Sequence, residues 1–342
     1  MYIRGGIKAR HIFYDSWRFV LIASLWSTFI VTLYEFFHLE LLAIPILPVS
    51  TIGIAVSLYL GFKSSSSYAR WWEARMIWGE IINKSRAWSN YVHNMIESDS
   101  TEEETRTRRD LIMRHVAWVN ALAYQLRKTS RLKESDHSHI FDYRRKFSDL
   151  SFHQCARSYE RHLDDQEAAL LAQYNNPATH LIRHQGERLR DLVNAEKLGD
   201  RRYVEMMNLI SDFYDCQGKC ERIKNTPFPR QIAVFGQIFT WIFILLLPLA
   251  FLETFANELT THKLYGADAH EYMFSLVPFT VLISWVFFMM EKVADSSEDP
   301  FEGGSNDVPI STLCRVIEID LRQSLGDKHV PPPLRSIDGI LY

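Results

Sequence analysis

Cysteine is scarce in this sequence, with only four among 342 residues. The cysteines form no paired CxxC set, so the sequence predicts neither a disulfide framework nor a zinc site. His180 and His184 have the i,i+4 spacing of metal ligands on a helix. No HExxH-type glutamate accompanies them, and we expect no metal there. The four cysteines are Cys155, Cys216, Cys220 and Cys314.

Sequence features of an enzyme are also missing. The four consecutive serines from Ser64 to Ser67 have neither the glycines nor the lysine of a phosphate loop. No nucleophile and base stand together near an apolar run. We therefore expect that the protein is not an enzyme and holds no cofactor. Charge of one sign is not in excess either, with 38 basic against 41 acidic residues, and this balance predicts no nucleic-acid partner.

What the sequence does contain is four long runs without a charged residue. Three of them have about the length that crosses a hydrocarbon core of roughly 30 Å. The first run is shorter, but polar and aromatic residues at its ends complete a crossing at the membrane interfaces. A cleaved signal peptide is the alternative for that run, although no small-x-small cleavage site follows it. We expect an all-α integral membrane protein whose four spans are Phe19 to Tyr34, Leu41 to Phe62, Gln231 to Leu252 and Tyr272 to Met290.

Basic residues predict the orientation of these spans. They precede the first and third runs and follow the second and fourth, so the positive-inside rule puts both termini and the long middle segment in the cytoplasm. The middle segment has apolar residues at spacings of three and four, as from Leu111 to Leu126, which predicts helices. The expected parts of the chain are 1–62, the N-terminus and two spans with a helix over 41–62; 63–230, a cytoplasmic helical domain; 231–290, two further spans; and 291–342, a cytoplasmic tail.

Two stripes of contrasting size run along the second span. Residues four apart lie on one face of a helix, and successive residues are rotated by about 100°. Small residues at this spacing let helices approach closely in lipid. Two alternatives stay open: such helices pack inside one subunit with the large stripe facing lipid, or identical helices pack in a ring with that stripe facing a shared axis. The large stripe is Ile54, Leu58 and Phe62, and the small one is Gly53, Ser57 and Gly61.

Ionisable residues are absent from all four runs. Pumps, carriers with a buried ion site and membrane enzymes with acid–base groups need such residues at depth. Their absence favours a passive route across the membrane, or a receptor or scaffold.

Three longer motifs occur along the chain: "GIAVSLYLGFKSSSSYARWWEAR" (Gly53 to Arg75), "GKCERIKNTPFP" (Gly218 to Pro229) and "EDPFEGGSNDVPI" (Glu298 to Ile310). In order and spacing they resemble signatures of the bestrophin family in its bacterial branch. This similarity spans nearly the whole chain. It implies a homopentamer around one central pore, with four membrane helices per subunit and a cytoplasmic helical domain that extends the pore. It also implies passive ion conduction in a bacterial inner membrane.

The resemblance also assigns roles to residues. It places the hydrophobic neck of the family on Ile54, Leu58 and Phe62, where five copies would form three apolar rings that gate by dewetting. It places a second, cytoplasmic constriction at Arg201, where relatives often carry an aliphatic residue. An arginine ring favours anions unless the side chain pairs with Asp200 or turns away from the axis. A surface arginine paired in place is the alternative.

Eukaryotic bestrophins hold calcium with an acidic run, and the counterparts here are Asp299 and Asp307. Gly303 and Gly304 interrupt the run, and calcium takes six or more oxygen ligands. We therefore expect no bound metal, and a turn that clamps the end of the fourth helix onto a neighbour instead.

The expected function is a pentameric channel that favours anions such as chloride and is gated by the neck. Its partners are copies of itself, membrane lipids and permeant inorganic ions. An acidic outer mouth supports the alternative of a sodium-selective channel, but its charge acts through water and is screened over about 10 Å. A non-conducting membrane scaffold or sensor is the other alternative.

Overall fold

The computed structural model is built of helices, which confirms the all-α prediction. Among the described residues there is no strand beyond an isolated bridge between Ile337 and Ile340. The chain divides into two compact units. The large unit comprises Met1–Arg4, Arg70–Pro227 and Asp299–Tyr342, and the membrane unit comprises Gly5–Ala69 and Phe228–Glu298. The structure describes residues 1, 9–97, 100–128, 158–262, 265–304, 306–337 and 339–342.

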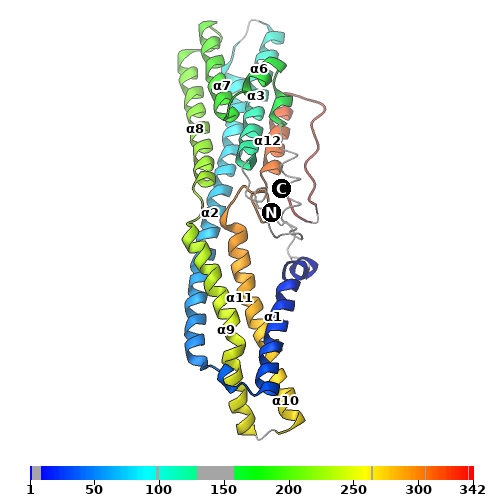
Figure 1. Ribbon diagram of the computed structural model, residues 1–342. Coiled ribbons are helices and arrows are strands. Elements are labelled where there is room, and N and C mark those ends of the chain that lie inside the picture. The colour runs from blue at the N-terminus through cyan, green and yellow to red at the C-terminus, as the bar shows by residue number, and fades with distance from the viewer. Residues whose placement is uncertain (2–8, 98–99, 129–157, 263–264, 305, 338) are drawn as a thin grey trace. The chain divides into compact units, whose positions relative to one another are not determined.

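Four helical segments of the described chain are long and apolar enough to cross a membrane, as the sequence predicts. In the membrane unit, α1 packs on α9 and α11, and α10 packs on α9 (Figure 1). The indole N–H of Trp26 donates to the carbonyl of Leu245 at 3.2 Å, and the hydroxyl of Thr280 donates to Ser27 at 3.0 Å. The elements of this unit are α1 (Ala9–Phe37), η1 (Glu40–Leu42), the first part of α2 (Ile46–Met95), α9 (Arg230–His262), α10 (Ala267–Phe274) and α11 (Leu276–Glu298).

The expected helix over 41–62 is wrong at both ends. Helix α2 begins at Ile46 and continues to Met95. It begins late because Ile44 precedes Pro45, and the proline ring disfavours a helical conformation in the residue before it. The carboxylate of Glu253 accepts the N–H of Ile46 at 3.2 Å, which satisfies one of the free amides at the start of the helix.

The expected span from Tyr272 to Met290 is interrupted. Helix α10 ends at Phe274, a turn follows at Ser275, and α11 begins at Leu276. The cause is Pro278, which has no N–H to donate to the carbonyl four residues before it and fits only the first turn of a new helix.

The large unit holds the main hydrophobic core of the described chain. Trp78, Trp88 and Trp118 are fully or almost fully buried in it. The indole N–H of Trp118 donates to the side-chain oxygen of Gln217 at 3.1 Å, and α3 packs on α7, α8 and α12. The elements of this unit are the second part of α2, α3 (Thr101–Lys128), η2 (Ser158–His162), α6 (Asp165–Leu171), α7 (Pro177–Asn194), α8 (Asp200–Asn225) and α12 (Ile310–Ser324).

Candidate pore-lining helix

The three predicted neck residues lie on one exposed line of α2. Ile54, Leu58 and Phe62 are 64%, 60% and 73% exposed in the single chain. The opposite face of the same segment is buried, since Val56 and Leu60 pack in a cluster with residues of α9. One subunit therefore covers one face of this segment and leaves the face with the large apolar side chains free.

The small stripe beside the neck divides between two environments. A Cβ atom on Gly53 would lie 2.7 Å from Cε2 of Phe243, so this glycine permits close contact between α2 and α9 inside the subunit. The same atom on Gly61 would meet nothing within 4 Å. The hydroxyl of Ser57 donates to the carbonyl of Ile54 at 2.8 Å and is satisfied within its own helix.

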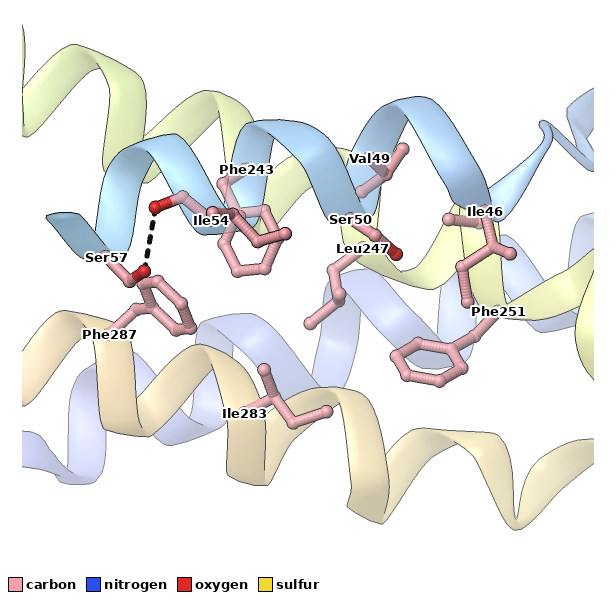
Figure 2. Close-up of a pocket in the computed structure, with 12 residues that line it drawn as sticks. Ile46, Val49, Ser50, Ile54, Ser57, Phe243, Leu247, Phe251, Ile283 and Phe287 are labelled. Carbon is pink, nitrogen blue, oxygen red and sulfur yellow. Dashed lines mark hydrogen bonds between the residues drawn. The ribbon is translucent and has the colours of Figure 1, made fainter.

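A cavity of about 340 Å³ opens beside Ile54. Figure 2 shows that α2, α9 and α11 line it, with the rings of Phe243, Phe251 and Phe287 around its wall. The ring centroids of Phe243 and Phe287 are 4.5 Å apart. Serine hydroxyls are the only polar side-chain groups in the lining, so the surroundings of Ile54 within the subunit are apolar.

Lys63 directly follows the predicted neck, and its side chain is buried. Its Nζ lies 3.1 Å from Glu291 and 4.0 Å from Glu298, both on α11. Lys63 is the first residue of the expected cytoplasmic domain over 63–230, and that expectation includes no such cluster. Two glutamates seven residues apart, and so on one face of a helix, are the sequence signal that could have found it.

The predicted constriction residue Arg201 lies in the first turn of α8 and is exposed. Among the described residues, no ion pair or hydrogen bond joins it to Asp200 or to another side chain. The neighbouring Arg202, in contrast, pairs with Glu97. Val204 is also exposed, at 56%, and lies one turn after Arg201 on the same face.

The two acidic residues weighed as calcium ligands are both engaged by protein groups. Asp307 is buried and accepts N–H groups of Phe301 at 2.8 Å, Gly303 at 2.7 Å, Gly304 at 3.3 Å and Val308 at 3.1 Å. Burial raises the pKa of Asp307, while the amide donors act in the opposite direction. A carboxylate oxygen of Asp299 lies 3.9 Å from the guanidinium of Arg70.

A family model described as Bacterial/Fungal Bestrophin protein matches residues 9–323. The chain belongs to the bestrophin family. It is 28% identical over 316 residues to a voltage-dependent anion channel-forming protein of Mesorhizobium japonicum, covering 91% of this chain and 84% of the relative. It is 26% identical over 284 residues to the voltage-dependent anion channel-forming protein YneE of Salmonella typhi, covering 83% and 78%. A crystal structure of a bacterial bestrophin homologue from Klebsiella pneumoniae matches with a TM-score of 0.72 at 25% identity, covering 91% and 98%.

The three bestrophin motifs fall on connected parts of the helices. The first, Gly53 to Arg75, lies wholly on α2. The second, Gly218 to Pro229, contains the end of α8 and the residues before α9. The third, Glu298 to Ile310, links the end of α11 to the start of α12. The motifs thus hold the predicted neck and the links between the membrane helices and the helices that follow or precede them.

The other residues weighed as metal ligands have different partners in this bestrophin. His184 lies 3.2 Å from Glu167, and His180 stacks on Tyr174. In the part of the chain that the structure describes, no three His, Cys, Asp or Glu side chains are grouped to hold a metal. Cys216, Cys220 and Cys314 are buried, and burial raises the pKa of Cys216 to about 11. Cys155 lies outside the described residues.

Proposed function

We propose that this bestrophin conducts ions passively through a pore that copies of the chain form together, with Ile54, Leu58 and Phe62 as the gate. One observation carries the proposal: three large apolar side chains lie in a line on the free face of α2 while the opposite face is buried in the subunit. The family membership and the relatives named as anion channel-forming proteins support it.

A face turned to lipid is the competing interpretation of this line, and the residues at its ends argue against it. Thr51 is exposed one turn before Ile54, and Ser65 is exposed one turn after Phe62. Along this face of α2, the three apolar side chains are therefore flanked by a hydroxyl group at each end. A short apolar constriction between polar groups is typical of a pore that gates by dewetting.

The proposed gate works through hydration. Five copies of each neck residue would form an apolar ring, and an ion that enters a narrow apolar ring loses water without gaining other oxygen or nitrogen ligands. Such a loss costs many kcal/mol for a charged group. A closed neck therefore blocks ions of either sign, and opening requires a wider or more polar ring.

We infer that anions are favoured because of Arg201. Its guanidinium is exposed and lies at the positive end of the α8 dipole, and a ring of arginines attracts anions. The outer acidic residues that favour cations are partly engaged, since Glu253 accepts the N–H of Ile46 and Glu35 pairs with His270. We propose that the pentamer lies in a bacterial inner membrane with both termini in the cytoplasm, as the distribution of basic residues predicts.

Recording from the purified protein in planar bilayers with asymmetric NaCl tests the proposal. For the native chain we expect a reversal potential between zero and the equilibrium potential of chloride. For Arg201→Ala we expect this potential to shift toward zero. A reversal at the sodium potential would establish the cation-selective alternative.

The neck is tested in the same bilayers by replacing Ile54, Leu58 and Phe62 together by alanine, which should raise the conductance several-fold. The matched control replaces Ile238, Ile242 and Leu245, three exposed apolar residues of α9, and should leave it unchanged. The absence of current from both the native and the neck-alanine protein would favour a non-conducting scaffold.

A further inference from the structure

A buried lysine follows the neck at a position where lysines usually reach water. Long basic side chains near the end of a membrane helix normally extend their charge toward the interface. The side chain of Lys63 is only 1% exposed, and those of Glu291 and Glu298 are 15% and 4% exposed. Lys63 thus turns into its own subunit, toward α11.

The direction of Lys63 determines the direction of Phe62. Adjacent residues on a helix are separated by about 100° of rotation, so a Lys63 side chain held against α11 keeps the side chain of Phe62 about 100° away from that direction. Leu58 and Ile54 precede Phe62 at intervals of four residues and lie on the same face of the helix. The rotation of α2 that satisfies Lys63 is therefore the rotation that leaves the neck line exposed.

A second polar contact acts on the same side of α2. Tyr59 lies one turn before Lys63, and its hydroxyl donates to the carbonyl of Ile232 on α9. The side chain of Leu60, between these two residues, is fully buried. One face of α2 is thus fixed to α9 and α11 at two successive turns.

The ion pairs of Lys63 restrict the rotation of α2 more strongly than the hydrogen bond of Tyr59 does. Breaking a buried ion pair by moving one partner leaves an uncompensated charge, which is strongly unfavourable, whereas the intact pair contributes little to stability. Rotation of α2 by one residue would remove the ammonium group from both glutamates. Buried ion pairs are best attested as devices that fix register.

We propose that Lys63, through Glu291 and Glu298, is a positioning residue that sets the rotation of α2 and thereby points the neck side chains at the pore. This inference rests on the proposed function, because it assumes that these side chains line a conduction path. Lys63 thus sets the direction of the gate side chains without contacting the permeating ion.

The first test measures the rotation of α2 without any current. Ser67 is fully buried, whereas Ser66 is exposed. We replace each by cysteine in the full-length protein and measure the rate of reaction with a water-soluble maleimide. In the Lys63→Met background the rate at position 67 should rise several-fold relative to position 66. Lys292→Met is the matched control, since it removes a lysine beside Glu291 whose ammonium lies over the ring of Phe288, and it should leave both rates unchanged.

The second test measures conduction in a double-mutant cycle. Lys63→Met should raise the conductance several-fold when the neck residues are native. It should change the conductance little when they are already alanine, because the large side chains whose direction Lys63 sets are then absent. A merely structural defect would alter the current in both backgrounds. The exchange of charges in Lys63→Glu with Glu291→Lys should restore low conductance and slow labelling at position 67.

The outcomes separate the two proposals. Unchanged labelling and conductance in Lys63→Met, in a protein whose neck-alanine variant conducts more, would overturn the positioning role and leave the channel intact. If Lys63→Met changes the labelling at position 67 but the neck alanines do not change the conductance, the proposed channel gate is wrong. The role of Lys63 in fixing the rotation of α2 would still hold. Should Lys63→Met fail to fold, Glu291→Gln and Lys63→Arg supply the same comparison, with a change expected for the first and rescue for the second.

Discussion

Replacing Asp307 by alanine should destabilise the loop between α11 and α12 by at least about 3 kcal/mol. The carboxylate accepts four backbone N–H groups, and those of Phe301, Gly303 and Val308 are buried. A buried donor left without an acceptor costs roughly 1–3 kcal/mol, so three of them set this lower limit. Phe301 also has a φ of 91°, a conformation that a non-glycine residue keeps only where its surroundings hold it.

Urea unfolding followed by tryptophan fluorescence measures this loss, because the core of the large unit contains three buried tryptophans. Asp307→Asn retains one acceptor oxygen and should lose about half as much. Asp299→Ala removes a partly exposed carboxylate 3.9 Å from Arg70 and should cost less than about 1 kcal/mol. The N–H groups of Phe301 and Gly303 donate to different oxygens of Asp307. Hydrogen exchange should therefore accelerate at both amides in Asp307→Ala, at one of them in Asp307→Asn and at neither in Asp299→Ala.

The same measurement tests calcium. Both carboxylate oxygens of Asp307 already accept amide hydrogens, so millimolar calcium should not move the urea midpoint. A ligand at a hundred times its dissociation constant would add about 2.7 kcal/mol. A midpoint that rises with calcium and no longer does so in Asp307→Asn, or an alanine variant within 1 kcal/mol of the native protein, would refute our account of this loop.

Two further predictions concern buried positions. Burial lowers the pKa of His115 to about 3, so the unfolded chain binds an extra proton below pH 6.5, and stability should fall by up to about 1.4 kcal/mol per pH unit from there toward pH 3. In His115→Gln, urea midpoints measured from pH 4 to 8 should show a shallower fall. A Cβ on Gly236 would lie 2.5 Å from Cε1 of Tyr59, so Gly236→Ala should lower the melting temperature, whereas Gly218→Ala, which meets nothing within 4 Å, should not. Equal melting temperatures would contradict the packing argument.

The existence of the membrane helices could be predicted because it depends on local composition. A run without charge is visible in the sequence, and four candidate spans are confirmed. Their boundaries were less accurate, since Pro45 and Pro278 each set a helix start that hydropathy does not register. The position of Ile54 and Leu58 on one face of a helix was also predictable, because it follows from the helical period alone.

Contacts between distant parts of the chain could not be predicted. The sequence gives no reason to pair Gly53 with Phe243 or Lys63 with Glu291, since each pair joins two helices whose relative rotation depends on the whole packed unit. A lysine after an apolar run usually marks the interface, and this rule says nothing about the partners of a buried lysine. The roles of the neck and of Arg201 stay predictions.

The division of the large unit into separate stretches of chain has a consequence for biosynthesis. Helix α12 contributes Ile310, Leu313, Ile317 and Leu321 to the same core as Trp88 and Trp118. Yet α12 is translated only after all four candidate membrane helices. The core that α2 and α3 begin to form therefore stays incomplete until α9, α11 and α12 have been synthesised. During this interval its apolar side chains are exposed, and the nascent protein is then most prone to aggregate.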